Sequence, residues 1–399
     1  MIKIEVDTRA LAESLYFLST PLKENPEYPV LSYIHCACEK TRIILRSTNI
    51  ETSVVSECVA HVESDSEIDT FLIPARQFIN IVTNSTAKKT LLNFNTESMS
   101  LKYSLDQSSG KLKCIASTDF PLPLYGHSES IRISVYDLSK IITQTIIACD
   151  TADTSRVVLT GIHLRVHDDI FEATSGDGYR LASCRIRLDR KYQEMQAVIP
   201  AKYLKPIRSI LRRFDDDYML SMRLPSAQNN KAMFEFGGTF FTTQVMSESF
   251  PNVSSVFDIK YDQALSIPVS SLEEAITIHG SYASNTNSAT YFKSNKNNQY
   301  CMVSRDEDSG IVGTVIADLD GSFTLPDISF NIKFLLDFIK VCGDDSILIY
   351  LKSESNAIHL RPVSDMASAD SSMGYLYYIM PIGDQITVDD QEYLYTAVP

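Results

Sequence analysis

Residues 199–214 read IPAKYLKPIRSILRRF, and a related stretch lies on either side of them at a similar distance. Residues 73–84 read IPARQFINIVTN, and residues 329–342 read SFNIKFLLDFIKVC. In the last stretch, apolar residues recur at the spacing of one helix face, at Ile332, Leu335, Leu336 and Ile339. Three related helices that recur at a nearly constant spacing indicate that the chain is built from repeated structural units.

A second set of helices occurs at the same period. These segments begin at Asp7 (DTRALAESLYFL), Asp137 (DLSKIITQTIIA) and Ser270 (SSLEEAITIHG). Each has a polar capping residue before an apolar stripe, and Ser271 with Glu274 predicts a capping box. Prolines at positions 121, 251 and 381 follow the same repeat, because each is 130 residues from the next.

Between the helices, apolar and polar residues alternate with the period of a half-buried strand. The alternating sets are Met99, Leu101, Tyr103 and Leu105; Ala182, Cys184, Ile186 and Leu188; Ile347, Ile349 and Leu351; and Tyr375, Tyr377 and Ile379. We therefore predict an α+β fold of three repeated domains, each with two helices packed on antiparallel sheets. The predicted domains are residues 1–128, 129–259 and 260–383, followed by a C-terminal extension at residues 384–399.

The composition is that of an ordinary globular protein, with 44% hydrophobic and 22% charged residues. The N-terminus has no apolar run of leader length, and no stretch is long enough to span a membrane, so the sequence predicts a cytoplasmic protein without membrane contacts. The eight cysteines lack CxxC spacing and are expected to be reduced core residues. Cys36 and Cys38 flank one residue of a strand pattern, which predicts sheet packing rather than a metal site.

No constellation of catalytic residues stands out, and the sequence predicts neither a cofactor nor a bound metal. It contains no GxSxG nucleophile turn and no GxxxxGK[ST] phosphate loop. His163 and His167 are four residues apart, but they lie in a strand-like run where that spacing has no helical meaning. The acidic run 215–217 is expected to be a solvated turn. Residues 175–181, SGDGYRL, resemble a ligand loop but are better explained as a hairpin turn with glycine at positive φ.

The predicted helix at residues 201–213 is unusually basic. It contains no acidic residue and five cations: Lys202, Lys205, Arg208, Arg212 and Arg213. The net charge of −14 would by itself argue against a nucleic-acid partner, but a surface needs positive charge only where phosphates lie. A solvated face normally mixes signs, so this helix predicts an anionic partner. Pro206 predicts either a kink or a late helix start.

Several strings in order, at the period of the repeat, resemble the β subunit of bacterial DNA polymerase III, the sliding clamp family, over the first 383 residues. In the first repeat they are PVLSYI (29–34), STNIET (47–52), IPARQF (73–78) and DFP (119–121). In the second they are RVVLTGIHL (156–164), ATSGDGYRLA (173–182), IPAKYL (199–204) and SFPNVSSVF (249–257). In the third they are FNIKFLLDFI (330–339) and YYIMPI (377–382).

The resemblance implies the DNA clamp fold and a non-catalytic processivity factor of DNA replication. Two chains would close head to tail as a homodimeric ring around double-stranded DNA, without sequence preference, near the nucleoid. The implied DNA-facing residues are Arg9, Arg76, Lys140, Lys202, Lys205, Arg208, Arg212 and Lys333. The implied dimer joint brings the strand with Leu112 and Cys114 against the helix end near Tyr282.

The resemblance also implies a hydrophobic pocket for short peptides of the clamp loader, DNA polymerase and repair proteins. Carried over residue by residue, this pocket comprises Arg156, Leu159, Gly178, Tyr179, Leu181, Pro251, Val256, Asn331, Phe334, Met380, Pro381 and Ile382. The sequence departs from the family at both sites. Tyr179 replaces a histidine, Ser255 and Gly383 replace arginines, and at the DNA-contacting loops Asn25 replaces an arginine and Asp153 a glutamine.

Two other hypotheses are open. The chain could be a divergent clamp paralogue, from a mobile element or dedicated to one pathway, with altered partners, as the departures suggest. It could also be an intracellular hydrolase with cryptic catalytic residues.

The tail contains Gln391, Leu394 and Tyr395 at the spacing that clamp-binding peptides use. This segment is expected either to be a disordered or strand-adding extension, or to occupy the peptide pocket of its own or a neighbouring ring.

Overall fold

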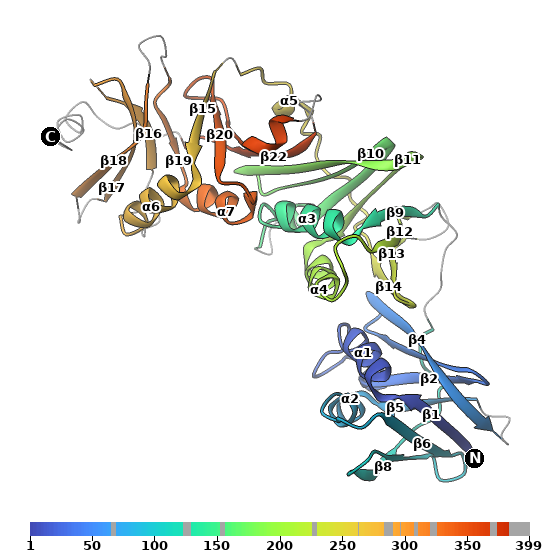
Figure 1. Ribbon diagram of the computed structural model, residues 1–399. Helices are drawn as coiled ribbons and strands as arrows, with labels where there is room; N and C mark the ends of the chain where they lie inside the picture. Colours follow the sequence, from blue (N-terminus) through green and yellow to red (C-terminus); the bar gives the residue numbers. More distant parts are fainter. Residues whose placement is uncertain are drawn as a thin grey trace. The chain divides into compact units, whose positions relative to one another are not determined.

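The computed structural model describes residues 1–64, 69–122, 129–151, 156–225, 230–261, 263–282, 290–295, 297–306, 310–319, 325–367 and 373–382. They form two compact units (Figure 1). Unit 1 is drawn from residues 1–136 and 202–245, and unit 2 from residues 137–201 and 246–399. Strands in both units pair antiparallel, and helices are separate from them in sequence, so the predicted α+β class is confirmed.

Unit 1 is built on one extended antiparallel sheet. Its strands are β1 (Ile2–Asp7), β2 (Tyr33–Glu39), β3 (Arg42–Thr48), β4 (Thr52–Ser64), β5 (Thr70–Pro74), β6 (Lys89–Asn95), β7 (Ser100–Ser104), β8 (Ser109–Lys113), β9 (Ile131–Ser134), β12 (Met219–Arg223), β13 (Lys231–Phe236) and β14 (Thr239–Gln244). The strand order is β8-β7-β6-β1-β4-β14-β13-β12-β9, and β2, β3 and β5 branch from β4. The pairing of β4 with β14 joins segments far apart in sequence, with Val54 opposite Phe241.

The helices of unit 1 form where an apolar stripe meets the sheet. They are α1 (Thr8–Leu18), the short 3-10 helix η1 (Pro29–Ser32), α2 (Ala75–Thr83) and nearly all of α4 (Ala201–Leu211). Asp7 caps α1 as predicted, because its Oδ1 accepts from the Ala10 N–H at 2.9 Å. The buried face of α1 includes Leu11, Leu15 and Leu18. α1 lies beside α2 on the sheet (Figure 1).

Unit 2 contains two separate antiparallel sheets. The first, of order β10-β11-β22-β21-β20-β15, comprises β10 (Gly161–Gly176), β11 (Arg180–Pro200), β22 (Gly374–Ile379), β21 (Ile358–Pro362), β20 (Ser346–Leu351) and β15 (Gln263–Pro268). The second, of order β18-β17-β16-β19, comprises β18 (Gly310–Asp318), β17 (Gln299–Asp306), β16 (Thr290–Ser294) and β19 (Ile328–Phe330). In the antiparallel pair of β11 and β22, Arg180 lies opposite Ile379.

The helices of unit 2 are α3 (Val135–Ile146), η2 (Val157–Thr160), α5 (Ser254–Phe257), α6 (Val269–Gly280), α7 (Ile332–Cys342) and η3 (Val363–Ala367). α6 and α7 lie side by side (Figure 1). Asn331 caps α7, because its Oδ1 accepts from the Lys333 N–H at 3.0 Å. The Gln144 side chain on α3 donates to the Val341 carbonyl at 3.5 Å, so α3 and α7 are neighbours.

Two local predictions are wrong, and one of the two alternatives for Pro206 is excluded. α6 begins at Val269 after Pro268, which has no side-chain capping bond, so the capping box of Ser271 and Glu274 does not form. The helix starts earlier because Pro268 provides the extended residue before it. α4 runs through Pro206 from Ala201, which excludes a late start. Met99 lies at φ 47° in a turn, and its strand begins at Ser100.

Several local predictions are confirmed. All eight cysteines are free, and Cys36 and Cys38 lie with their sulfur atoms 4.0 Å apart within β2. The acidic run 215–217 is exposed. Residues 177–179 form the turn between β10 and β11, with Gly178 at φ 93°. Apart from these confirmed predictions, no helix within the described residues combines the length and apolar character needed to cross a membrane.

Candidate functional site

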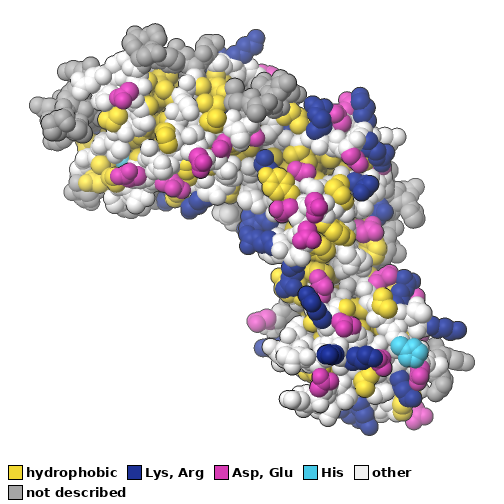
Figure 2. All heavy atoms as spheres, in the orientation of Figure 1, with side chains coloured by type: hydrophobic (Ala, Val, Ile, Leu, Met, Phe, Trp, Pro, Cys, Tyr) yellow, Lys and Arg dark blue, Asp and Glu magenta, His cyan; other side chains and the backbone are white. Residues whose placement is uncertain are grey.

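α4 has one face of cations that meets solvent and an opposite apolar face that is buried. Lys202 and Lys205 are exposed, Arg208 is half-buried, and Arg212 is exposed just after the helix end. The apolar face is fully buried, at Leu204, Ile207, Ile210 and Leu211. This amphipathic arrangement leaves the charges on the outer face of the helix. Figure 2 shows Lys and Arg side chains gathered over α4.

Few acidic groups neutralise these cations. Lys202 Nζ lies 3.6 Å from a carboxylate oxygen of Glu51 and 4.7 Å from the centre of the Tyr203 ring. The Tyr203 hydroxyl donates to Glu51 and, with Lys202 close by, lowers the pKa of that carboxyl. In the described part of the chain, no ion pair involves Lys205 or Arg208. Both therefore keep their charge for an external anion.

The remaining DNA-facing candidates lie on other helices. Arg9 on α1 and Arg76 on α2 are exposed in unit 1, and these two helices contact each other. Lys140 on α3 is half-buried and Lys333 on α7 is exposed in unit 2, where α3 and α7 are neighbours. All of these candidates except Arg212, which follows the end of α4, are thus carried by helices.

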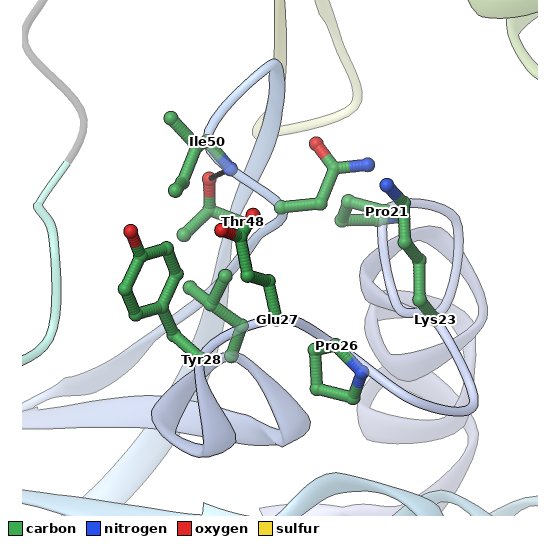
Figure 3. A pocket seen from close by; sticks show the side chains of 9 residues that line it. Pro21, Lys23, Pro26, Glu27, Tyr28, Thr48 and Ile50 are labelled. Atoms are coloured by element: carbon green, nitrogen blue, oxygen red, sulfur yellow. Dashed lines mark hydrogen bonds between the residues drawn. The ribbon is translucent and has the colours of Figure 1, made fainter.

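A hollow beside β3 and β4 is lined by a lysine, Lys23, that the sequence analysis did not consider. Figure 3 shows it between the loop after α1 and the β3–β4 turn, lined by Lys23, Tyr28 and Ile50 among others. Ile50 has φ 78°, which is unfavourable for a β-branched residue, and its N–H donates to Thr48 Oγ1 at 3.0 Å. Asn25, where the resemblance implied the loss of an arginine, lies in the same loop, and Lys23 is a cation two residues before it that the sequence analysis did not consider.

The second candidate site is built around the β10–β11 turn of unit 2. Asp177 Oδ1 accepts from the N–H groups of Tyr179 and Arg180, both at 2.9 Å, which fixes the turn. Gly178 is required there because of its positive φ, and the Arg156 guanidinium lies against it, 3.3 Å from where a Cβ would stand. Tyr179 is consequently held outward, with 68% of its surface exposed.

The end of β22 lies directly beside this turn. The Met380 N–H donates to the Tyr179 carbonyl at 2.8 Å, and Met380 is 40% exposed. Two residues later, the Ile382 N–H donates to the Ser329 carbonyl at 2.9 Å. The structure therefore brings Tyr179, Met380 and Ile382 together as an outward-facing apolar surface.

Arg180 connects the turn to α7. Its guanidinium donates to Asp177 at 2.9 Å and to Asp337 at 2.6 Å, and it stacks 4.4 Å from the centre of the Phe334 ring. The two carboxylates and the Tyr377 hydroxyl raise the pKa of Arg180 in spite of its burial. Phe334 is thus held beside the turn by Arg180, which the sequence analysis did not include among the site residues.

The other pocket candidates differ in how accessible they are. Leu181 and Leu159 are only 7% and 5% exposed, and each belongs to a packed apolar cluster. Val256 packs against the cluster of Leu181, and Phe250, next to Pro251, packs against that of Leu159. These leucines are therefore supports beneath the surface rather than exposed anchors. Pro251 is exposed and Pro381 is half-buried.

The dimer-joint candidates lie on elements at the edges of the fold. Leu112 on β8 and Cys114 after it are buried within their own unit, at 9% and 1% exposure. β8 ends the strand order of unit 1, so its backbone edge, rather than these side chains, is open among the described residues. Tyr282 is half-buried just past the end of α6.

The family departures and the tail divide between described and undescribed residues. Ser255 is exposed on α5. Asp153, Gly383 and the tail, with Gln391, Leu394 and Tyr395, lie outside the described residues.

Histidines and carboxylates do not assemble into a chemical site. Among the described residues, no group of three His, Cys, Asp or Glu side chains could hold a metal ion. His163 forms one hydrogen bond with the Gln196 side chain and stacks on Phe250, so its contacts are those of a structural residue. Burial lowers the pKa of His279 to about 4, so it is a neutral core residue near pH 7.

Comparison with known proteins identifies the family of the chain. Residues 2–124 match the family model of the DNA polymerase III beta subunit, N-terminal domain, and residues 132–252 match that of its central domain. A beta sliding clamp of Staphylococcus epidermidis is 24% identical over 348 residues, covering 84% of this chain and 89% of that protein.

Solved structures show the same fold. The DNA polymerase sliding clamp of Bacillus subtilis superposes with a TM-score of 0.83 at 19% identity, covering 96% of this chain and 100% of that one. A sliding clamp of Pseudomonas aeruginosa, solved bound to griselimycin, has a TM-score of 0.81 at 20% identity, covering 96% of this chain and 99% of that one. The predicted clamp fold is therefore confirmed.

Proposed function

Since the chain belongs to the DNA polymerase III beta subunit family, we propose that it is a sliding clamp that encircles duplex DNA and tethers replication proteins to it. The observation that carries this proposal is the row of solvent-facing cations on α4 in a chain of net charge −14. A ring with positive charge along its bore binds phosphates without reading bases. In this role the chain catalyses nothing itself.

The test of encirclement is retention on circular DNA. The clamp is placed on nicked plasmid by its clamp loader and passed through a gel-filtration column, with and without cutting of the plasmid. We expect retention on the circle and loss after linearisation. Direct binding of the chain to linear duplex DNA, without the loader, should weaken steeply with salt, because each phosphate contact releases counterions.

The charge requirement is tested by reversing three cations of α4. Lys205→Glu with Arg208→Glu and Arg212→Glu should abolish retention on the circle and leave the oligomeric state unchanged. The charge-matched control reverses three cations of β11: Arg187→Glu, Arg190→Glu and Lys191→Glu. Equal retention by both triple variants would show that α4 does not face DNA.

We further infer that the apolar surface around Tyr179 and Met380 binds short peptides of polymerases and other DNA-processing proteins. Each large apolar side chain that a peptide buries contributes about 1.5 to 3 kcal/mol. Supporting this role, Tyr179 and Met380 are exposed while the side chains beneath them are packed. Exposed large apolar side chains grouped on a surface are typical of protein-interaction sites.

Exposed residues give a cleaner test of this site than Leu181, whose truncation would also disturb a core cluster. Tyr179→Ala with Met380→Ala should weaken binding of a labelled replicative-polymerase peptide at least about tenfold, or about 1.4 kcal/mol. The control, Tyr136→Ala with Met219→Ala, removes side chains of similar exposure, 52% and 40%. Fluorescence anisotropy measures both, and wild-type affinity in the first variant would exclude the surface.

A further inference from the structure

The outward-facing apolar surface is uncovered in the described structure. It comprises Tyr179, Met380, Pro381 and Ile382, and Val157 follows Arg156, whose guanidinium lies against Gly178 in the turn that presents Tyr179. Val157, Tyr179, Met380 and Ile382 are 50%, 68%, 40% and 38% exposed. Large apolar side chains gathered at one place on a surface mark a binding site.

This surface carries a cation at its edge. Arg156 precedes Val157, and its guanidinium lies against Gly178 in the turn that presents Tyr179. Arg156 is exposed. An occupant with apolar side chains next to acidic ones would therefore match the surface both in burial and in charge.

The chain itself supplies such a segment. Its described part ends at Ile382, a member of the apolar surface, and the sequence continues for residues 383–399, GDQITVDDQEYLYTAVP. Tyr393, Leu394 and Tyr395 are three consecutive large side chains of the kind that an apolar surface binds. Acidic residues immediately precede them, at Asp389, Asp390 and Glu392.

We propose that residues 391–395 bind the apolar surface of their own chain and compete there with partner peptides. This inference rests on the proposed peptide-binding role of that surface. The eight residues 383–390 span at most about 28 Å when extended, which is enough to leave Ile382 and return. A short tether of this kind gives a local concentration near the millimolar range, so even weak binding inhibits a partner.

The first test compares the whole chain with two tail variants. Deletion of residues 384–399 should tighten binding of a labelled polymerase peptide several-fold, and Leu394→Ala with Tyr395→Ala should do the same. The matched control, Ile386→Ala with Val388→Ala, removes apolar side chains from the same tail before the acidic run. It should bind with wild-type affinity.

The second test supplies the segment in trans. A synthetic peptide of residues 388–396 should displace the labelled peptide from the deleted chain. Its direct binding to the deleted chain, measured by calorimetry, should be lost when Tyr179→Ala and Met380→Ala are added. The gain in affinity on deletion should be the same at all protein concentrations, because the contact lies within one chain.

The outcomes separate this inference from the function on which it rests. If the deleted and whole chains bind the polymerase peptide equally well, the tail does not compete, although the peptide site stands. If neither chain binds it, the proposed peptide site fails. A gain that grows with protein concentration would assign the tail to a neighbouring ring and overturn binding within the chain.

Discussion

His279 shows how a single buried residue couples the stability of the fold to pH. Its side chain on α6 is fully buried and bonds to Ser304 Oγ at 2.9 Å and Thr314 Oγ1 at 3.0 Å. Desolvation lowers its pKa to about 4 from the usual 6.5. The unfolded chain therefore binds a proton below pH 6.5 that the folded chain excludes, so this stability is present above pH 6.5 and is lost toward pH 4.

His279→Gln should accordingly weaken the pH dependence of unfolding. Between pH 7 and pH 5.5 the wild-type His279 contributes a loss of about 1 kcal/mol, which the glutamine variant should not show. Urea denaturation at both pH values measures the difference. His61→Gln, at an exposed histidine, should retain the wild-type pH dependence. An unchanged dependence in His279→Gln would show that this histidine is protonated equally in both states.

Individual residues were predictable where the cause is local. The Asp7 cap and the positive φ of Gly178 each follow from a few neighbouring residues, and both predictions are confirmed. The burial of Leu181 and the bridge from Arg180 to Asp337 were not predicted. Both depend on α7 and β22, which reach the β10–β11 turn only through the folded sheet, so no local pattern indicates them.

At the scale of elements, α4 combines the cations that we propose to face DNA with an unfavourable backbone. Pro206 lies inside the helix and has no N–H, so the carbonyl of Lys202 lacks its helical partner. Pro206→Ala restores this bond, although it also makes the unfolded chain more flexible. We expect the free energy of unfolding to rise by about 1 to 2 kcal/mol.

Urea denaturation measures this gain directly. Ser209→Ala is the matched control on the same helix, because it removes only an exposed hydroxyl that donates to the Lys205 carbonyl at 3.3 Å. Its effect should stay within about 0.5 kcal/mol. A loss of stability in Pro206→Ala would show that the proline fits a deformation that alanine cannot adopt.

The repeated helices could be predicted because amphipathic periodicity is a property of consecutive residues. All six predicted helices form, with starts that differ by up to three residues. The pairing of strands was harder to predict from the sequence. The register of β4 with β14 joins residues such as Ser53 and Thr242, and only the packed sheet determines that partner. The sequence therefore predicts the elements and their class, but not the strand order.

At the scale of the whole molecule, the described part of the unit 1 sheet has an edge at β8 that is open to a partner strand. β8 is the last strand of the order, and an edge strand presents unpaired backbone groups that favour addition of another chain. The Cys114 N–H, which donates to the Met99 carbonyl, and the Ser108 carbonyl, which accepts from the Leu105 N–H, both face the side of β7. Since bonding direction alternates along an antiparallel pair, the N–H of Lys111 points to the open edge.

We therefore predict a homodimer whose joint uses the backbone edge of β8. Wild-type protein in sedimentation equilibrium should have twice the chain mass of 44.7 kDa. Lys111→Pro removes one edge donor, spares the bonds to β7 and should raise the dissociation constant at least about tenfold. Lys111→Thr keeps the donor and should remain dimeric. A wild-type mass of 44.7 kDa at every concentration would rule out the two-chain ring. An unchanged dissociation constant in Lys111→Pro would instead place the joint at another sheet edge, because an edge strand that pairs across a joint cannot lose a donor without weakening it.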